Sequence, residues 1–186
     1  MQQEIQNAYE TLINGGIILY PTDTIWGIGC DATHSDAVKK VYALKNRAES
    51  KSMIVLVNNE QMLYKHFSEI PETAIQIWEL ANRPTTLILE KPKNLAHEII
   101  APDNSVGVRI CKEPFCYKLI ERLKRPLVST SANLSGMPSP TKYADIVPEI
   151  VNGVDYVVQL HQEKIMNLPS TIIKLNLNGE IKILRK

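Results

Sequence analysis

Several features that would mark a particular class of protein are scarce or missing in this sequence. Its 186 residues include only three cysteines, Cys30, Cys111 and Cys116, which show no paired CxxC spacing. An odd number without that spacing argues against a disulfide framework or a zinc site. No apolar run approaches the roughly 20 residues that cross a bilayer, and the N-terminus lacks the layout of a signal peptide. We therefore expect a cytoplasmic protein that does not enter a membrane.

Charge of one sign is also lacking. The chain carries 21 basic and 20 acidic residues, a formal net charge of +1, so any basic binding site has to come from local clustering. The phosphate loop GxxxxGK[ST], the GxGxxG fingerprint and the GxSxG elbow are absent. The four histidines are scattered without metal spacing, so we expect no metal held by the protein itself.

What the sequence does contain is an alternation of helical and strand patterns typical of one α/β domain. A chain of this length, 44% hydrophobic, can bury a core by itself, and we expect a single domain over residues 1–186 with no second domain after it. Helices are predicted at 4–14, 72–81, 115–123 and from an N-cap at Ser35 to Leu44. Strands are predicted at 17–20, 53–57, 85–90, 105–110, 127–130, 155–160, 170–175 and 180–185. Because Asn178-Gly179 predicts a terminal hairpin, the sheet should mix parallel and antiparallel pairs.

Two polar segments follow the first predicted strand and the second predicted helix. Residues 21–29, PTDTIWGIG, could bind a ligand beyond the strand end, or could be a turn whose Asp and Thr satisfy their own backbone. Residues 45–52, KNRAESKS, hold three cations within seven positions. They could neutralise a polyphosphate, but cations also favour helix C-termini through the macrodipole, and alone this simpler reading is preferred.

Two further segments combine hydroxyls with strand ends. Residues 129–141, STSANLSGMPSPT, leave an apolar strand and hold many hydroxyl groups and an Asn, which suits anions and ribose edges. Arg109 alternates with apolar residues on the predicted strand 105–110, so it should point into a cleft or form an internal ion pair. Ser170 follows in the PST segment near the C-terminus.

Taken in order, these segments resemble the YrdC family of threonylcarbamoyl-adenylate synthases. The matching pieces are PTDTIWGIG, KNRAESKSMIVLV, RPTTLIL, SVGVRI, STSANLSGMPSPT and PSTII, and they run from about residue 10 to the C-terminus. The resemblance implies a twisted mixed sheet with flanking helices and a concave, positively lined cleft. It also implies that ATP, L-threonine and bicarbonate are joined into threonylcarbamoyl-AMP, with Mg²⁺ accompanying ATP. A downstream threonylcarbamoyl transferase would use the product to modify tRNA beside the anticodon.

The family's site residues map onto matching positions of this chain. The resemblance implies that Lys45 and Arg47 act in catalysis. The residues implied to contact ATP are Arg47, Lys51, Ser105, Ser131, Asn133, Ser139 and Arg185. Those implied to contact threonine are Thr24, Arg109, Ser129 and Ser170.

The chain departs from the family pattern at two positions near the expected cleft. Leu56 stands where some relatives have a histidine beside threonine, and Arg83 stands where glycine is common. Two other functions remain open at this point: a module that binds tRNA or double-stranded RNA without catalysis, and a paralogue that has lost the synthase activity. Pyrophosphate release that depends on both threonine and bicarbonate would separate these possibilities.

Overall fold

The computed structural model describes residues 1–46 and 53–186, so the predicted site residues Arg47 and Lys51 lie outside the described residues. The helices are α1 (Gln2–Ile13), α2 (Ser35–Leu44), α3 (Glu60–His66), α4 (Glu72–Leu80), α5 (Pro114–Leu123) and α6 (Pro148–Gly153). The strands are β1 (Ile18–Tyr20), β2 (Gly27–Gly29), β3 (Ile54–Val57), β4 (Thr85–Glu90), β5 (Ser105–Ile110), β6 (Leu127–Ser131), β7 (Tyr156–Val157), β8 (Thr171–Leu175) and β9 (Ile181–Arg185).

The strands of the described residues form one mixed sheet in the order β7-β1-β2-β6-β3-β5-β4-β8-β9. The pairs β1–β7, β3–β5 and β4–β8 are parallel, and the other neighbours are antiparallel. The α/β class, the mixed sheet and the C-terminal hairpin are thus confirmed. Because β6 lies between β2 and β3, it joins strands β7, β1 and β2 to strands β3, β5, β4, β8 and β9.

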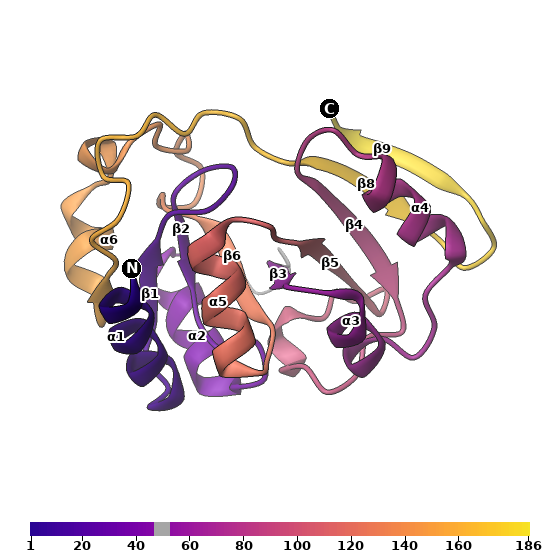
Figure 1. Ribbon diagram of the computed structural model, residues 1–186, viewed down its shortest axis with the longest axis horizontal. Coiled ribbons are helices and arrows are strands. Elements are labelled where there is room, and N and C mark those ends of the chain that lie inside the picture. Colours follow the sequence, from indigo (N-terminus) through magenta and orange to yellow (C-terminus); the bar gives the residue numbers. More distant parts are fainter. Residues whose placement is uncertain (47–52) are drawn as a thin grey trace.

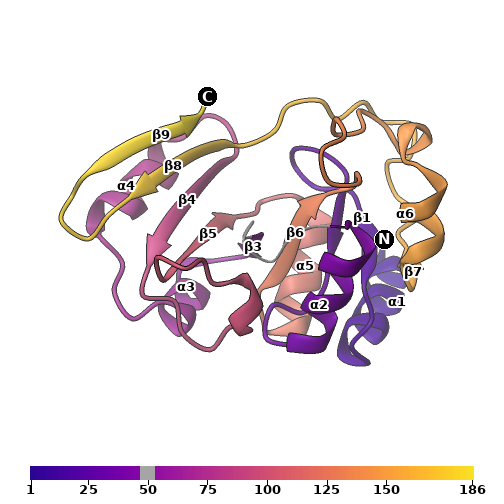
Figure 2. The same cartoon turned by 180° about the vertical axis from the view of Figure 1, so that it is seen from behind.

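Helices cover both faces of this sheet, as binary patterning requires. Figure 1 shows α1, α3, α4 and α5 on the near side, and Figure 2, from behind, shows α2 and α6 on the other side. The hairpin β8–β9 lies beside α4, at the opposite end of the molecule from α1 and α6. Among the described residues, no helix is long and apolar enough to cross a membrane.

The structure corrects one predicted helix start. The N-cap of α2 is His34, whose ring Nδ1 accepts a hydrogen bond from Ala37 N at 3.2 Å. Ser35, predicted to be the cap, is the first helical residue and donates its hydroxyl hydrogen to Glu98 Oε1 instead. Histidine can play this part because a neutral imidazole has one acceptor nitrogen, like the oxygen of the usual capping residues.

Three elements are not foreseen by the sequence patterns. Strand β2 reads as a glycine-containing loop, yet a Cβ at Gly29 would stand 2.3 Å from Val128 O, so only glycine allows this pairing with β6. Helices α3 and α6 have only 7 and 6 residues, too short for a clear periodic pattern. Asn59 marks the start of α3 by accepting a hydrogen bond from Met62 N.

The alternation of side chains along β5 prepares the functional site. Val106 and Val108 are buried among the core residues, and Arg109 necessarily faces the other way. A Cβ at Gly107, which shares the Arg109 face, would stand 2.9 Å from Ile54 Cγ2. The prediction that Arg109 leaves the apolar side of its strand is therefore confirmed.

Burial makes the thiols inert, which gives a first testable consequence. All three cysteines are free and buried, and burial raises the pKa of both the Cys30 and the Cys116 thiol. Since the thiolate is the reactive form, the native protein should react with less than one equivalent of a thiol-specific disulfide reagent, and with three equivalents in denaturant. Rapid reaction of a thiol in the native protein would contradict this burial.

Candidate functional site

Two cavities flank the segment 21–25, and only the smaller one gathers predicted site residues. It has a volume of about 170 Å³. Its lining residues are Thr22, Thr24, Ile25, Gly27, Met53, Ile54, Arg109, Ser129, Thr130, Ser131, Ser139, Pro169, Ser170, Ile172 and Arg185. Seven predicted contacts therefore converge from loop 21–25, strands β5, β6 and β9, and the segments before β8 and after β6.

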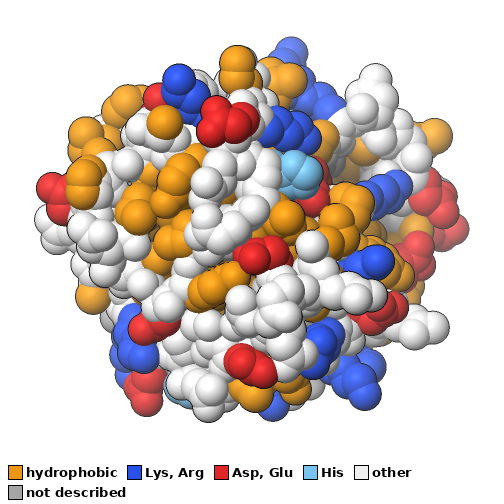
Figure 3. Space-filling model, turned by 60° about the vertical axis from the view of Figure 1, so that its left-hand side comes forward, with side chains coloured by type: hydrophobic (Ala, Val, Ile, Leu, Met, Phe, Trp, Pro, Cys, Tyr) orange, Lys and Arg blue, Asp and Glu red, His pale blue; other side chains and the backbone are white. Residues whose placement is uncertain are grey.

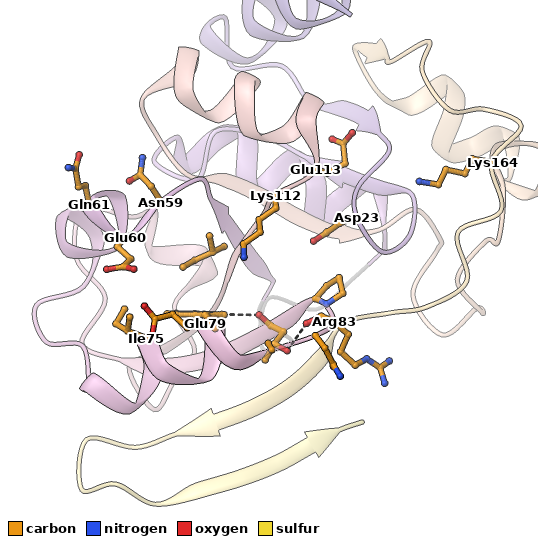
Figure 4. A pocket seen from close by; sticks show the side chains of 16 residues that line it. Asp23, Asn59, Glu60, Gln61, Ile75, Glu79, Arg83, Lys112, Glu113 and Lys164 are labelled. Carbon is orange, nitrogen blue, oxygen red and sulfur yellow. Dashed lines mark hydrogen bonds between the residues drawn. The ribbon is translucent and has the colours of Figure 1, made fainter.

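The larger cavity, of about 950 Å³, contains none of the predicted site residues. Figure 4 shows it between α3, α4 and the start of α5, with Glu60, Glu79, Lys112 and Asp23 around it. Arg83, the departure from the family pattern, lines this cavity and not the smaller one. Its charged side chains are of both signs and mostly exposed, so size alone does not make it the reaction site.

Loop 21–25 is held by its own threonines. The Thr22 and Thr24 hydroxyls lie 2.9 Å apart, and the Thr22 hydroxyl also donates to Ile25 O at 2.8 Å. This pattern satisfies the local backbone, which was the simpler reading of the segment. The same loop also lines the cavity, so ligand binding by this segment stays a prediction.

A buried ion pair ties this loop to β5. Arg109 Nη2 donates to Asp23 Oδ1 at 2.9 Å and to Thr24 Oγ1 at 3.3 Å, and the exposed fractions of the Arg109 and Asp23 side chains are 3% and 19%. The Arg109 Nε group is buried and has no hydrogen-bond partner within residues 1–46 and 53–186. A buried donor left unsatisfied is costly, so this guanidinium retains hydrogen-bonding capacity that a ligand carboxylate could use.

Ser170 and Arg185 form the opposite wall. Arg185 Nε donates to Ser170 O at 2.8 Å and Nη2 to Ser170 Oγ at 3.2 Å. The Ser170 hydroxyl also lies 2.9 Å from that of Thr86 on β4. Burial, and next the positive charge of Arg109, lower the pKa of the Arg185 guanidinium. The two guanidinium groups are therefore close enough for their charges to interact.

Three of the described predicted residues do not line either cavity. Ser105 lies at the start of β5, four positions before Arg109, and donates to Asp103 Oδ1 at 2.6 Å. Asn133 donates its side-chain amide to Leu134 O and Met137 O, within its own loop. Lys45 is buried and donates to Ser131 O and Asn133 O. Asn133 thus orders its own loop, whereas the ATP contact implied for it stays a prediction.

Leu56, a departure from the family pattern, does not line the smaller cavity. Leu56 is fully buried and pairs with Arg109 and Leu127 across the sheet, while Met53 and Ile54 line the smaller cavity. Asp23 and Thr86 were missed by sequence reasoning. Asp23 could have been found, because it lies in the polar PTDT segment after a predicted strand. Thr86 could not, because it reaches the site only through its contact with Ser170.

Size and charge limit what the described cavity can hold. A volume near 170 Å³ is below the range of about 300–1,000 Å³ usual for cofactor-sized ligands, so it suits an amino acid and a nucleotide would extend beyond it. Figure 3 shows basic and acidic side chains interspersed on one face of the molecule. The positive lining expected of the whole cleft stays a prediction, because Arg47 and Lys51 lie outside the described residues.

Comparisons with known proteins identify the family to which this chain belongs. The family profile of Sua5, YciO and YrdC, described as telomere recombination, matches residues 10–186. A putative threonylcarbamoyl-AMP synthase of Methanocaldococcus jannaschii is 36% identical over 88% of this chain and 76% of that protein. The threonylcarbamoyl-AMP synthase of Pseudoalteromonas translucida is 29% identical over 97% of both chains.

Solved structures give the same fold. Sua5 of P. abyssi in complex with L-threonine superposes with a TM-score of 0.88 at 27% identity, covering 100% of this chain and 54% of that one. The chain thus spans a little over half of that longer protein. YciO of E. coli, at 22% identity and a TM-score of 0.86, supports the fold alone. The chain belongs to the Sua5, YciO and YrdC family.

The buried ion pair predicts a specific loss of stability. Replacing Asp23 by Ala would leave the buried Arg109 charge without this carboxylate partner. We therefore expect the free energy of unfolding in urea to fall by about 3 kcal/mol. The matched control is Glu69→Ala, which removes the carboxylate of an exposed pair with Lys91 and should cost less than about 1 kcal/mol. Equal losses in the two variants would mean that the Asp23–Arg109 pair contributes no more than a surface pair.

Proposed function

We propose that the chain is an L-threonylcarbamoyladenylate synthase, which forms threonylcarbamoyl-AMP and pyrophosphate from L-threonine, bicarbonate or carbon dioxide, and ATP. The observation that carries this proposal is the convergence of seven predicted contacts around one cavity. The names of its relatives, and the threonine complex of a homologous structure, point to the same reaction. The proposal assigns the described cavity to threonine and its open side to the nucleotide.

Threonine would be recognised through both of its ends. Arg109 would take the carboxylate, because its buried Nε has no partner among the described residues and a guanidinium suits carboxylate geometry. Thr24, Ser129 and Ser170 would supply hydroxyl groups for the amino acid's polar atoms. Since Asp23 already occupies Nη2 of Arg109, the guanidinium would be fixed before the ligand arrives.

The nucleotide would lie along the outer part of the site. Ser131, Ser139 and Arg185 line the cavity and would contact ATP there, with Arg47 and Lys51 offsetting the triphosphate charge and Ser105 further along β5. Within the described residues, no group of three or more His, Cys, Asp or Glu side chains could hold a metal ion. Mg²⁺ would therefore be held by phosphate oxygens and water, its usual ligands with nucleotides, and would neutralise charge on the departing pyrophosphate.

The reaction requires positioning more than acid–base chemistry. The threonine amine adds to carbon dioxide and loses a proton, and an oxygen of the resulting carbamate forms a bond to the α-phosphorus of ATP. The bond from that phosphorus to the bridging oxygen then breaks, and pyrophosphate leaves with its electron pair. Arg109 would hold one reactant and the serines the other, which supplies the orientation that such displacements depend on.

Two partners belong to the proposal as well. The product would pass to a threonylcarbamoyl transferase that modifies tRNA beside the anticodon. Direct binding of tRNA or double-stranded RNA would need a focused basic patch, given the net charge of +1. Such binding is separate from the catalytic proposal.

A pyrophosphate-release assay tests the function directly. Release from ATP should require L-threonine and bicarbonate together, and omission of either should reduce the rate to background. Arg47→Ala should abolish release while the thermal unfolding midpoint is retained, because a charge on the triphosphate would be left without its partner. A chain that binds RNA but releases no pyrophosphate would contradict the proposal.

The threonine pocket has its own test. Arg109→Ala should raise the KM for threonine at least tenfold and leave the KM for ATP within twofold, since one charge-assisted contact is worth about 1.5–3 kcal/mol. Arg125→Ala is the matched control, because Arg125 also pairs with an aspartate, Asp31, at 2.6 Å but precedes β6 at the strand end away from the cavity. An unchanged threonine KM would make Arg109 a structural arginine only.

A further inference from the structure

Lys45 belongs to the basic segment but differs from an ordinary phosphate-binding lysine in its burial. Its side chain lies at the C-terminal cap of α2 and is only 1% exposed. The ammonium donates to two main-chain carbonyls, Ser131 O at the end of β6 and Asn133 O in the segment after it. The residue that follows, Asn46, has a φ of 48°, a left-handed conformation common where a helix ends.

The main chain of Lys45 contacts the same segment. Its carbonyl accepts a hydrogen bond from Ser135 N at 2.9 Å. Residues 131–137, here called the nucleotide loop, are therefore held from both the side chain and the backbone of one helix-terminal residue. At least two of the three ammonium donors are used in these contacts.

The nucleotide loop is otherwise bonded mostly to itself. Asn133 donates to Leu134 O and Met137 O, and Met137 N donates to Leu134 O at 3.1 Å. Its main chain is also anchored to the sheet, because Ser131 pairs with Gly27 of β2 and Ala132 N donates to Trp26 O at 3.0 Å. Ser131 is therefore placed by the sheet and Lys45 together, while the contacts to α2 decide where residues 132–137 lie.

We propose that Lys45 is a positioning residue, which sets the place of the nucleotide loop and does not contact the triphosphate. This inference rests on the proposed function, because it takes Ser131 to be a nucleotide contact. It divides the basic segment by role: Lys45 acts through the loop, while Arg47 and Lys51 are left to offset phosphate charge. Met at position 45 would keep most of the apolar stem but leave two carbonyls without their donor.

The test compares ligand binding by Lys45→Met and the wild type, measured by calorimetry with ATP and Mg²⁺ and separately with L-threonine. We expect the Kd for ATP to rise at least tenfold and the Kd for threonine to change less than twofold. The ATP Kd should keep its wild-type dependence on added salt, since no phosphate contact is lost. Lys40→Met is the matched control, because Lys40 on the same helix also donates to a main-chain carbonyl, Gly15 O, at 2.9 Å; its ATP Kd should be that of the wild type.

Tryptophan fluorescence can report the position of the nucleotide loop without any measurement of catalysis. The chain has two tryptophans, so in a Trp78→Phe background Trp26, whose carbonyl anchors the loop, is the only emitter. Lys45→Met should shift its emission, whereas Lys40→Met should not. An unchanged emission together with a flatter salt dependence of ATP binding would identify Lys45 as a phosphate contact and overturn the proposal.

A wild-type experiment covers the case in which Lys45→Met does not fold. An adenosine diphosphate that carries a pyridoxal group forms an imine with amines near bound phosphates, and borohydride reduction makes the label permanent. Peptide mapping should find no label on Lys45; a label there, suppressed by ATP, would overturn the proposal. Failure of the synthase function would instead appear as wild-type protein that releases no pyrophosphate, a result that leaves these binding measurements readable.

Discussion

The site depends on the burial of one guanidinium, that of Arg109. Arginine keeps its charge in a protein interior, so the chain has to provide a carboxylate nearby. Asp23 does so from a loop that is 86 positions away in sequence. This pairing draws loop 21–25 onto β5 and brings Thr24 to the cavity. A constraint on the stability of the fold thus also fixes the geometry of the site.

Two other cations, Arg185 and Lys45, differ from Arg109 in their hydrogen-bond partners. Arg185 hydrogen-bonds to Ser170, and Lys45 is enclosed by main-chain carbonyls. Neither contact involves a carboxylate among the described residues. A locally positive site would not conflict with the near-zero net charge of the chain, because clustering of a few cations is enough to attract an anion.

Sequence patterns predicted the strands and helices more completely than they predicted the contacts between side chains. Continuous apolar runs identified the strands from β3 to β6, and Asn178-Gly179 identified the terminal hairpin. By contrast, β2 depends on the close approach of Gly29 to Val128 O, a tertiary contact that no local pattern shows. The resemblance to a family named Arg109 and Ser170 as threonine contacts and Arg185 as an ATP contact, whereas their bonding to one another, to Asp23 and to Thr86 required coordinates. The burial of Lys45 at the end of α2 could not be predicted either, because the residue type does not show whether a helix-end cation is buried or exposed.

The pairing of β8 with β9 has a consequence for the cavity wall. Strand β9 is an edge strand whose residues are all exposed, and edge hairpins are among the first parts of a sheet to open. Arg185 ends this strand and bonds to Ser170 in the cavity. Transient fraying of the C-terminus would therefore remove one wall of the site, and a ligand that engages Arg185 would suppress the fraying. The apparent Kd of such a ligand thus equals its intrinsic Kd divided by the fraction of molecules in which β9 is closed.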